Sequence, residues 1–461
     1  AHHLPLKGVK HFAYFIRLRS TMTWLDRMIE IHKGMTVELA KDDELKVQLE
    51  KAKVAAEQTR TVLQQHLPMF QEFSDRSESA NATGDITQYR FNQGVLPDAM
   101  REVSHTILLE FRELEDRLRK ISDRLKDVME NDFGDIDRQT AENWFPVVGI
   151  MLARAEGAIS LWRAFSIEDH GDYAPHARWI TYKPLGNEAE ITLSSSPVLA
   201  ADALRDFLWN ECFAAVLTSA TLTALGTFDF LKMRSGLHEN TVYKCIPSPF
   251  DFQNKANLRI PMEGFDPSDN DGHTQAIVEL LPELIEEGKG ALVLFSSRRQ
   301  MQMVQQGLDE SMQFNLLSQD EHSKQELIRL HKERVDKGQT SIIFGLASMT
   351  EGIDLSGDYC TNVVIAKIPF AVPNDPVEAT LGEWIKGQGK NPFQEISVPE
   401  ASMKLIQASG RLLRRESDTG TITILDERLL KKFYGKGILN SLPPYRLEIF
   451  TRDVASAISE P

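Results

Sequence analysis

The sequence predicts an α/β protein that carries a long-helix, all-α insertion. In the last two-fifths of the chain, short runs of β-branched, aliphatic and aromatic residues alternate with helical segments. Strands buried on both faces of a parallel sheet have this continuous apolar character. In the first third, apolar residues recur at heptad spacing in highly charged surroundings, which indicates packed helices.

The first third predicts an antiparallel helical arm. Its main helix, over 97–130, is expected to be roughly 50 Å long at 1.5 Å per residue. The apolar positions that recur along it at spacings of four and three are Ile107, Phe111, Leu114, Leu118, Ile121, Leu125 and Val128. A shorter seam of the same kind consists of Trp24, Met28, Ile31 and Met35. Further helices are expected over 47–67 and 143–165, and a loop over 74–93. A purely structural spacer would give the same pattern.

The rest of the chain predicts the α/β part in order. Short strands are expected over 178–184 and 190–195, and a helix over 199–209. Buried strands are then expected over 214–218, 291–295, 341–344, 362–368 and 421–425. Helices are expected over 299–311, 324–337 and 401–413. In a doubly wound fold, ligands bind at the carboxyl ends of such strands.

The charge balance limits the classes of partner. The net charge of −15 argues against a protein that coats nucleic acid along its whole surface. It leaves room for a local basic channel, because the distribution of charge matters more than its sum. Basic residues do gather late in the chain, in Lys404, Arg411, Arg414, Arg415, Arg428, Lys431, Lys432 and Lys436.

Three cysteines, Cys212, Cys245 and Cys360, lie far apart in the sequence and suggest neither a metal site nor a disulfide framework. They are expected to be small buried hydrophobes in a reducing compartment. We find no apolar run of membrane length and no signal peptide, so a cytoplasmic location is expected. The chain begins at Ala1 rather than at Met.

The most informative stretch is QASGRLLRR, over 407–415. If it is helical, Gln407, Gly410, Arg411 and Arg414 lie on one face, because they are spaced i, i+3, i+4 and i+7. Two neighbouring arginines repel each other unless an anion lies between them, and the guanidinium fork suits polyphosphate oxygens. Gly410 would let a ligand approach the backbone. A solvated basic helix face is the alternative.

Three further motifs follow expected strands. They are VLTSATL over 216–222, VLFSSR over 293–298 and FGLASMTEGIDL over 344–355. The first two place hydroxyl groups at a strand exit, and the second adds an arginine that suits a backbone phosphate. The third places two carboxylates around Gly352, where they can bind a ribose hydroxyl or pair with arginines. Ordinary helix capping and polar turns are the alternatives for all three.

The order of these motifs resembles that of the DinG family of superfamily 2 DNA helicases, which are relatives of the iron–sulfur XPD-type helicases. The motifs above look like helicase motifs III, IV, V and VI, with QASGRLLR as motif VI. Two segments resemble DinG in particular: Gly382-Glu383-Trp384 through Asn391-Pro392-Phe393, and Asp426 to Lys436. The resemblance covers essentially the whole chain, and Ala1-His2 resembles the end of a DEAH box.

The resemblance implies four segments. Residues 1–7 would be the end of motif II, and 8–168 a helical Arch-like domain. Residues 169–238 would be a remnant of the first RecA-like domain with motif III. Residues 239–461 would be the second RecA-like helicase domain.

The resemblance also implies site residues. The catalytic group would be Arg411, Arg414 and Gln407, with the arginines neutralising charge on the transferring phosphoryl group. The nucleotide-binding group would be Glu351, Gly352, Asp354, Gly410 and His2. The residues that couple the two motor domains would be Ser219 and Thr221. The residues that contact the DNA backbone would be Ser296, Ser297, Arg298 and Thr350. No metal ligand is expected in this chain.

Several parts of a complete helicase are absent from the sequence. It contains no Gly-x-x-x-x-Gly-Lys-Ser/Thr loop, no Asp-Glu pair before Ala1 and no cysteine cluster. The resemblance therefore implies a C-terminal fragment of an ATP-dependent 5′–3′ DNA helicase of DNA repair, inactive by itself. ATP and Mg²⁺ would bind at the interface with a missing first motor domain, and a 4Fe–4S cluster would lie upstream.

The implied partners are single-stranded DNA and forked or R-loop DNA, without a membrane, and the expected state is a monomer. Two other functions fit the same features. One is a catalytically incomplete module that binds nucleic acid or a partner. The other is a structural coiled-coil protein with an α/β cap.

Overall fold

The computed structural model describes residues 13–80, 85–131, 135–169, 174–186, 188–346, 349, 353–371 and 375–451. By its internal contacts the chain divides into two units. The first comprises Ala1–Asn210 and Pro373–Lys390, and the second comprises Glu211–Val372 and Asn391–Pro461. The segments 1–7, 8–168, 169–238 and 239–461 were inferred from the order of the helicase-like motifs and not from contacts. They stay predictions.

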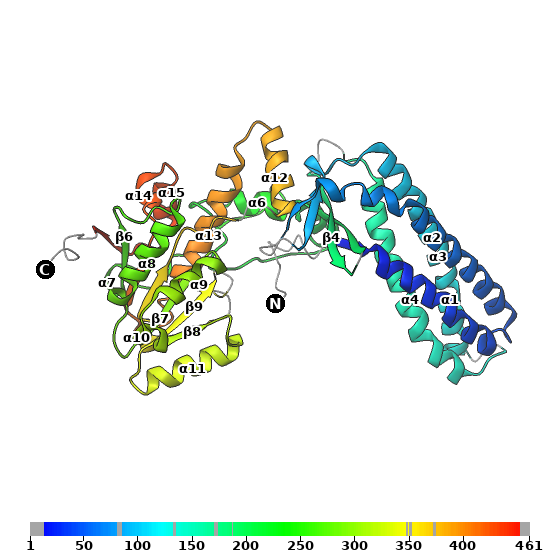
Figure 1. Ribbon diagram of the computed structural model, residues 1–461, viewed down its shortest axis with the longest axis horizontal. Helices are drawn as coiled ribbons and strands as arrows, with labels where there is room; N and C mark the ends of the chain where they lie inside the picture. Colours follow the sequence, from blue (N-terminus) through cyan, green and yellow to red (C-terminus); the bar gives the residue numbers. More distant parts are fainter. Residues whose placement is uncertain are drawn as a thin grey trace. The chain divides into compact units, whose positions relative to one another are not determined.

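The first unit contains the helical arm, drawn in blue to cyan in Figure 1. Its helices are α1 (Leu18–Leu39), α2 (Asp43–Gln71), α3 (Asp98–Asn131) and α4 (Arg138–Ser166). All seven apolar residues of the predicted α3 seam are buried, because they face the neighbouring helices α2 and α4. Of the shorter seam, Ile31 is exposed, and His32 is buried in its place.

A five-stranded antiparallel sheet completes the first unit. Its order is β1 (Tyr14–Arg17), β5 (Glu188–Pro197), β4 (His176–Leu185), β3 (Thr87–Arg90) and β2 (Glu78–Ser79). The predicted strands over 178–184 and 190–195 are confirmed as β4 and β5. The predicted loop over 74–93 is wrong in part, since β2 and β3 lie within it. These short strands form because the backbone of β3 pairs with β4, and the backbone of β2 pairs in turn with β3.

Helix α12 (Pro376–Gly387) packs in the first unit, although its sequence neighbours belong to the second. Arg90 donates from both terminal nitrogens to the Glu383 carboxylate, at 2.8 and 2.6 Å. The Gln93 amide donates to the same carboxylate at 2.6 Å, from a residue with a φ of 51°. Glu383 of the predicted Gly-Glu-Trp motif therefore anchors α12 to strand β3 and the turn η3 (Asn92–Gly94).

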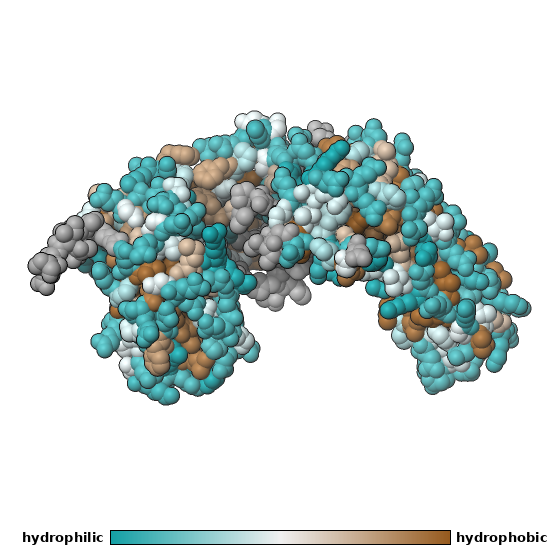
Figure 2. Space-filling model, viewed as in Figure 1, coloured by the Kyte–Doolittle hydropathy of each residue, from teal (hydrophilic) through white to brown (hydrophobic). Residues whose placement is uncertain are grey.

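One helix among the described residues, α4, is long and apolar enough by length and composition to cross a membrane. The core helix of a soluble protein passes the same test of length and composition. Helix α4 packs against α3 and buries Trp162 and Phe165 completely, as a core helix of a bundle does. In the view of Figure 2, the surface of the arm is mostly hydrophilic, with hydrophobic patches.

The second unit is built on a seven-stranded parallel sheet (Figure 1). Its order is β12 (Arg446–Phe450), β6 (Ala256–Pro261), β11 (Gly420–Ile424), β10 (Asn362–Ile365), β7 (Gly290–Phe295), β9 (Ser341–Leu346) and β8 (Leu316–Ser318). Every pairing in this sheet is parallel. Four of the five predicted buried strands are thus confirmed, as β7, β9, β10 and β11.

The central strands are buried on both faces, as their continuous apolar runs predict. In β7, Leu292 and Leu294 belong to one core, and Val293 and Phe295 belong to the other. The first core is covered by α11 (Lys324–Asp336), α13 (Val398–Ser409) and α15 (Gly435–Ser441). The second is covered by α8 (Asn270–Leu284), α9 (Arg298–Gly307) and α10 (Glu310–Asn315). The predicted α/β fold with a long-helix arm is confirmed.

The short helical elements of both units lie in the connections. They are η2 (Ser74–Arg76), α5 (Ala201–Leu204), η4 (Arg205–Trp209), α6 (Asp229–Ser235), α7 (Phe252–Lys255), η6 (Gly357–Tyr359), η7 (Phe393–Ser397) and α14 (Arg428–Lys431). The helix predicted over 199–209 is confirmed in outline, as α5 followed by the π-turn η4.

The predicted strand over 214–218 is wrong. These residues form no strand, and the side chain of Val216 is 90% exposed. A buried parallel strand needs hydrogen-bonding neighbours on its edges, and none of the strands in the described ranges pairs with this segment. An apolar run alone therefore does not make a strand.

His331 on α11 is fully buried against strand β9. Its Nε2 donates to the Tyr359 carbonyl at 2.7 Å, and its Nδ1 accepts from the Ser341 hydroxyl at 2.8 Å. Burial lowers the pKa of His331 to about 4, and the Tyr359 hydrogen bond only partly opposes that effect. The folded protein therefore holds this imidazole neutral.

The stability of the second unit is expected to fall between pH 6.5 and pH 4 through His331. In this window the unfolded chain binds a proton that the folded chain does not, so stability rises with pH and is lost on acidification. The full effect is about 3 kcal/mol for a pKa lowered from 6.5 to about 4. Urea titrations over this range should show a shallower pH dependence for His331→Gln. The exposed control His238→Gln should match the unsubstituted chain, and an unchanged slope in His331→Gln would contradict the assignment.

Candidate functional site

The arginine segment does not continue helix α13, contrary to the prediction for 401–413. The helix ends at Ser409, with Gly410 as its C-cap, and tight turns follow. The chain leaves the helix because Leu412 and Leu413 must enter the core ahead of β11. The inference that four residues share one helix face is therefore wrong. A Cβ at Gly410 would lie 3.1 Å from the Ile406 carbonyl oxygen, a tight contact with backbone.

The two predicted arginines nevertheless converge on one atom. Arg411 donates from Nη1 to the carbonyl oxygen of Ile353 at 3.2 Å, and Arg414 donates from Nη2 to the same oxygen at 2.9 Å. Ile353 belongs to the loop after β9 that the sequence had singled out. Two positive charges thus share one neutral acceptor, and nothing in that contact neutralises them.

Both guanidinium groups keep a buried nitrogen without a hydrogen-bond partner. The Nε atoms of Arg411 and Arg414 are both buried and unpaired among the described residues. Arg414 forms an ion pair with Asp354, but the 3.8 Å distance from Nε to the carboxylate is too long for a hydrogen bond. The Asp354 side chain is 84% exposed, so solvent screens this pair. The site therefore has donor capacity that the described side chains do not use.

Asp418 holds the arginine turn against the loop after β9. Its carboxylate accepts from the backbone amides of Arg414 and Arg415, at 2.8 Å each, and from the Gly357 amide at 3.1 Å. The side chain is almost completely buried. The sequence analysis missed this residue. The signal that could have revealed it is the position of this Asp, four residues after Arg414 and just before a strand.

Gln407 and Thr221 are brought together. The Gln407 amide donates from Nε2 to the Thr221 hydroxyl at 3.1 Å, across 186 positions of sequence. The Ser219 hydroxyl accepts from the Thr221 amide at 3.3 Å and so shapes the turn. The predicted coupling pair is thus next to one of the predicted catalytic residues.

The motif after β7 places its residues differently. Ser297 caps α9 by accepting from the Gln300 amide at 3.4 Å, which is the ordinary capping role. Arg298 is exposed and pairs with Asp320 at 3.2 Å. Ser296 is half-buried at the strand end. No described contact joins these three residues to Arg411 or Arg414.

Four predicted site residues, His2, Thr350, Glu351 and Gly352, lie outside the described residues. Of the predicted nucleotide-binding group, Asp354 and Gly410 are described. Arg411, Arg414 and Asp354 lie together, and Gln407 precedes them on the end of α13.

The described residues do not fit a metal centre. They contain no group of three or more His, Cys, Asp or Glu side chains placed to hold an ion. A 4Fe–4S cluster takes four thiolates, and this chain has three cysteines. One of them, Cys360, is a neutral thiol at ordinary pH, because burial raises its pKa to about 12 despite the nearby charge of Arg414.

Comparison with known proteins agrees with the motif order. Residues 281–445 match the family model described as the helicase C-terminal domain. The protein named ATP-dependent DNA helicase DinG from Photobacterium profundum is 35% identical over 461 residues, which cover 97% of this chain and 63% of that protein. The protein of the same name from Salmonella choleraesuis is 29% identical over 478 residues, covering 97% and 62%.

A solved structure described as S. tokodaii Xpd4 is similar in fold, with a TM-score of 0.51 at 14% identity. The similarity covers 96% of this chain and 73% of that one. The chain spans less than two thirds of the length of the two curated relatives. These relatives and the matched domain confirm the resemblance inferred from the motifs: residues 281–445 match a helicase C-terminal domain, and nearly the whole chain is similar to the DinG helicases.

Proposed function

We propose that this chain supplies the second motor domain and the helical arm of an ATP-dependent DNA helicase. One observation carries the proposal: Arg411 and Arg414 converge on a single neutral carbonyl, and each keeps a buried nitrogen without a partner among the described residues. A triphosphate offers the charge and the oxygen atoms that would complete this arrangement. The name of the relatives, ATP-dependent DNA helicase, gives the same reaction.

In this proposal ATP is held by a neighbouring motor domain and presented to the two arginines. Arg411 and Arg414 neutralise the charge that develops on the transferring phosphoryl group. Their Nη atoms remain on the Ile353 carbonyl, which fixes the direction of each guanidinium plane. Gln407 senses the γ-phosphate, and its bond to Thr221 passes that state to the segment after residue 218.

The remaining predicted roles are part of the same proposal. Ser219 couples nucleotide state to domain movement together with Thr221. The nucleotide-contacting residues are Glu351, Gly352, Asp354, Gly410 and His2. The residues on the DNA backbone are Ser296, Ser297, Arg298 and Thr350. Ser297 caps α9, and Arg298 pairs with Asp320. For these two residues, contact with DNA is therefore secondary to a structural role.

The finer features are likewise proposals: movement 5′ to 3′ on single-stranded DNA, action on forked or R-loop DNA in repair, a monomeric state and a cytoplasmic location. Mg²⁺ accompanies ATP in helicases of this kind, and a 4Fe–4S cluster is part of the resemblance. We assign neither to the residues of this chain, because the described part offers no donor set for them.

A second function is favoured by the composition of the chain by itself. With no phosphate-binding loop in its sequence, the isolated chain is expected to behave as a DNA-binding module without turnover. Salt-dependent binding to single strands that ignores added nucleotide would be the signature of that module.

ATP turnover tests the proposal. The 461-residue chain alone is expected to show no hydrolysis above a blank, with or without single-stranded DNA. A chain of the full length of the curated relatives is expected to hydrolyse ATP and to displace a labelled strand from a fork. Hydrolysis by the 461-residue chain would show that the catalytic groups have been misplaced, and a full-length chain without DNA-stimulated turnover would contradict the helicase proposal.

A further inference from the structure

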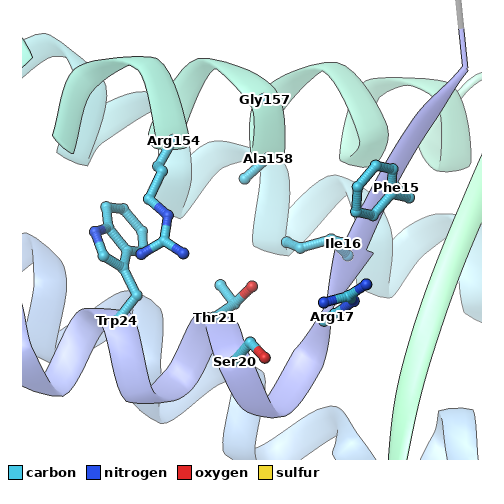
Figure 3. A pocket seen from close by; sticks show the side chains of 9 residues that line it. All are labelled: Phe15, Ile16, Arg17, Ser20, Thr21, Trp24, Arg154, Gly157 and Ala158. Atoms are coloured by element: carbon cyan, nitrogen blue, oxygen red, sulfur yellow. The ribbon is translucent and has the colours of Figure 1, made fainter. Parts of the chain in front are cut away.

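A cavity of about 330 Å³ opens at the base of the helical arm, within the first unit. Strand β1 and the first turns of α1 form one side, and α4 forms the other (Figure 3). Its volume is within the range of small-ligand sites. Nothing in the predicted helicase motifs refers to this cavity, because its residues precede or lie between them in the sequence.

Two arginines line the cavity and carry charge that no described carboxylate balances. Arg17, at the end of β1, and Arg154, on α4, form no ion pair with any residue in the described ranges. Arg154 instead lies over the ring of Trp24, 5.7 Å from its centroid, and Arg17 lies 6.0 Å from the ring of Phe15. Figure 3 shows Arg154 descending from α4 toward α1, and Arg17 on the opposite side of the gap. Two guanidinium groups around one space suit a phosphate.

Hydroxyl groups and a helix start add to the polar side of the cavity. Ser20 and Thr21 lie on the first turns of α1 and face it (Figure 3). Helix α1 begins there without a side-chain cap and without an acidic residue in its first turn. Glu190 is the competing anion nearby, and it is engaged by the Ser20 hydroxyl at 3.0 Å and the Arg19 amide at 3.1 Å. The partial positive charge of the helix start adds to that of the two arginines.

An exposed aromatic ring lies at the rim. Phe15 is 63% exposed on β1, which is an edge strand of its sheet. Nucleic-acid bases stack on exposed aromatic rings of this kind. Trp24, by contrast, is buried and covered by Arg154, so it lines the cavity but offers no ring face for a base to stack on.

Small residues line the α4 side of the cavity. Gly157 and Ala158 line it, and a Cβ added at Gly157 would meet no atom within 4 Å. A glycine inside a long helix costs about 1 kcal/mol relative to alanine, so its place at this cavity is not explained by helix stability.

We propose that this cavity binds one nucleotide unit of single-stranded DNA, with the phosphate between Arg17 and Arg154 and the base on Phe15. The inference rests on the proposed function insofar as DNA is the ligand. The proposed site adds a contact with the DNA strand in the helical arm, formed by residues other than those that follow β7 and β9. Recognition is of backbone charge and a base face, so it carries no sequence preference.

A charge-reversal pair tests the cavity without removing either arginine. Gly157→Glu places a carboxylate at the cavity, and Gly149→Glu places one about two turns away on α4, where a Cβ also meets no atom within 4 Å. Affinity for an oligothymidylate of about 16 nucleotides, measured by fluorescence anisotropy, should fall roughly tenfold in Gly157→Glu. The control Gly149→Glu should bind within about twofold of the unsubstituted chain. Equal binding by the two variants would overturn the proposal.

The salt dependence of binding tests the arginines. Each phosphate contact on a single strand contributes a slope of about −0.7 to log K against log salt. The double variant of Arg17→Gln and Arg154→Gln should therefore lower the magnitude of the slope by about 0.7, because the two arginines share one phosphate. Arg27→Gln with Arg163→Gln, on the same two helical regions and outside the cavity, is the matched control and should keep a steeper slope. Identical slopes in the two double variants would contradict a phosphate contact.

The aromatic contact has its own pair of variants. Phe15→Ala should weaken strand binding about fivefold or more, because it removes a stacking surface. Tyr14→Ala removes the neighbouring ring, which points to the other face of the strand, and should leave binding unchanged. Circular dichroism of each variant confirms that the arm is folded.

Ligand controls separate this proposal from others. If the cavity variants lose affinity for thymidine monophosphate or inorganic phosphate but bind the strand normally, the cavity is a free-nucleotide or phosphate site and the strand proposal is overturned. If the cavity variants and their controls bind the strand equally well, the cavity proposal fails and the helicase proposal stands. If the unsubstituted chain does not bind the strand, the proposed function itself is contradicted.

Discussion

Replacement of Arg414 by alanine is expected to lower DNA-stimulated ATP turnover by about 10³-fold or more, in a chain of the full length of the curated relatives. Arg414 presents one of two guanidinium groups whose charge no described carboxylate balances through a hydrogen bond. Losing it leaves the transferring phosphoryl group without half of that charge. Affinity for single-stranded DNA should stay within about twofold, because no phosphate-backbone contact is assigned to Arg414.

The neighbouring arginine provides the control. The Arg415 side chain is exposed, and its contribution to the turn is made by its backbone amide, which Arg415→Ala retains. Steady-state hydrolysis, measured by phosphate release, should be near normal in Arg415→Ala. Normal turnover in Arg414→Ala would remove the catalytic assignment, and an equal loss in both variants would point to a structural effect of the turn.

Replacement of Asp418 by alanine is expected to destabilise the second unit by about 3 kcal/mol and to lower ATP turnover with it. Three backbone amides, of Arg414, Arg415 and Gly357, lose their acceptor at a buried position. The arginine turn and the loop after β9 then lose the group that joins them, so neither guanidinium keeps its place. Urea unfolding, followed by circular dichroism, gives the stability change.

Two companions sharpen this test. Asp418→Asn keeps one carbonyl oxygen as an acceptor and should recover part of the stability. Glu416→Ala removes an exposed carboxylate two residues away and should change stability by less than about 0.5 kcal/mol. A stability of Asp418→Ala equal to that of Glu416→Ala would show that Asp418 does not hold the turn.

The sequence predicted elements well where one kind of interaction decides the structure. The runs that became β7, β9, β10 and β11 are apolar throughout because both faces of the sheet are covered. The α3 seam was predicted correctly since heptad spacing leaves a helix one way to bury its stripe.

Prediction from the sequence failed where contacts between residues far apart in the chain decide the structure. The run over 214–218 has the residues of a buried strand, but pairing requires neighbours that local composition does not reveal. Strands β2 and β3 were missed because their polar sequences become strands only by pairing, β3 with β4 and β2 with β3. Helix α13 was extended too far, since Leu412 and Leu413 fit a helical pattern as well as they fit the turn they occupy.

The candidate site shows the same division. Residue types and motif order predicted that Arg411 and Arg414 act together, and the structure brings both to the Ile353 carbonyl. The prediction that the two arginines lie together because they share a helix face was wrong. A backbone carbonyl leaves no mark in the sequence, and Asp418 acts through backbone amides that any residue can supply, so neither partner was predicted.

The most direct measurement is a structure of a chain of the full length of the curated relatives, bound to ADP, a γ-phosphate mimic and single-stranded DNA. The account predicts that Arg411 and Arg414 both lie within about 3 Å of the mimic's oxygens, with Asp418 still bonded to the turn. A mimic bound elsewhere, with neither guanidinium group in contact with its oxygens, would contradict it.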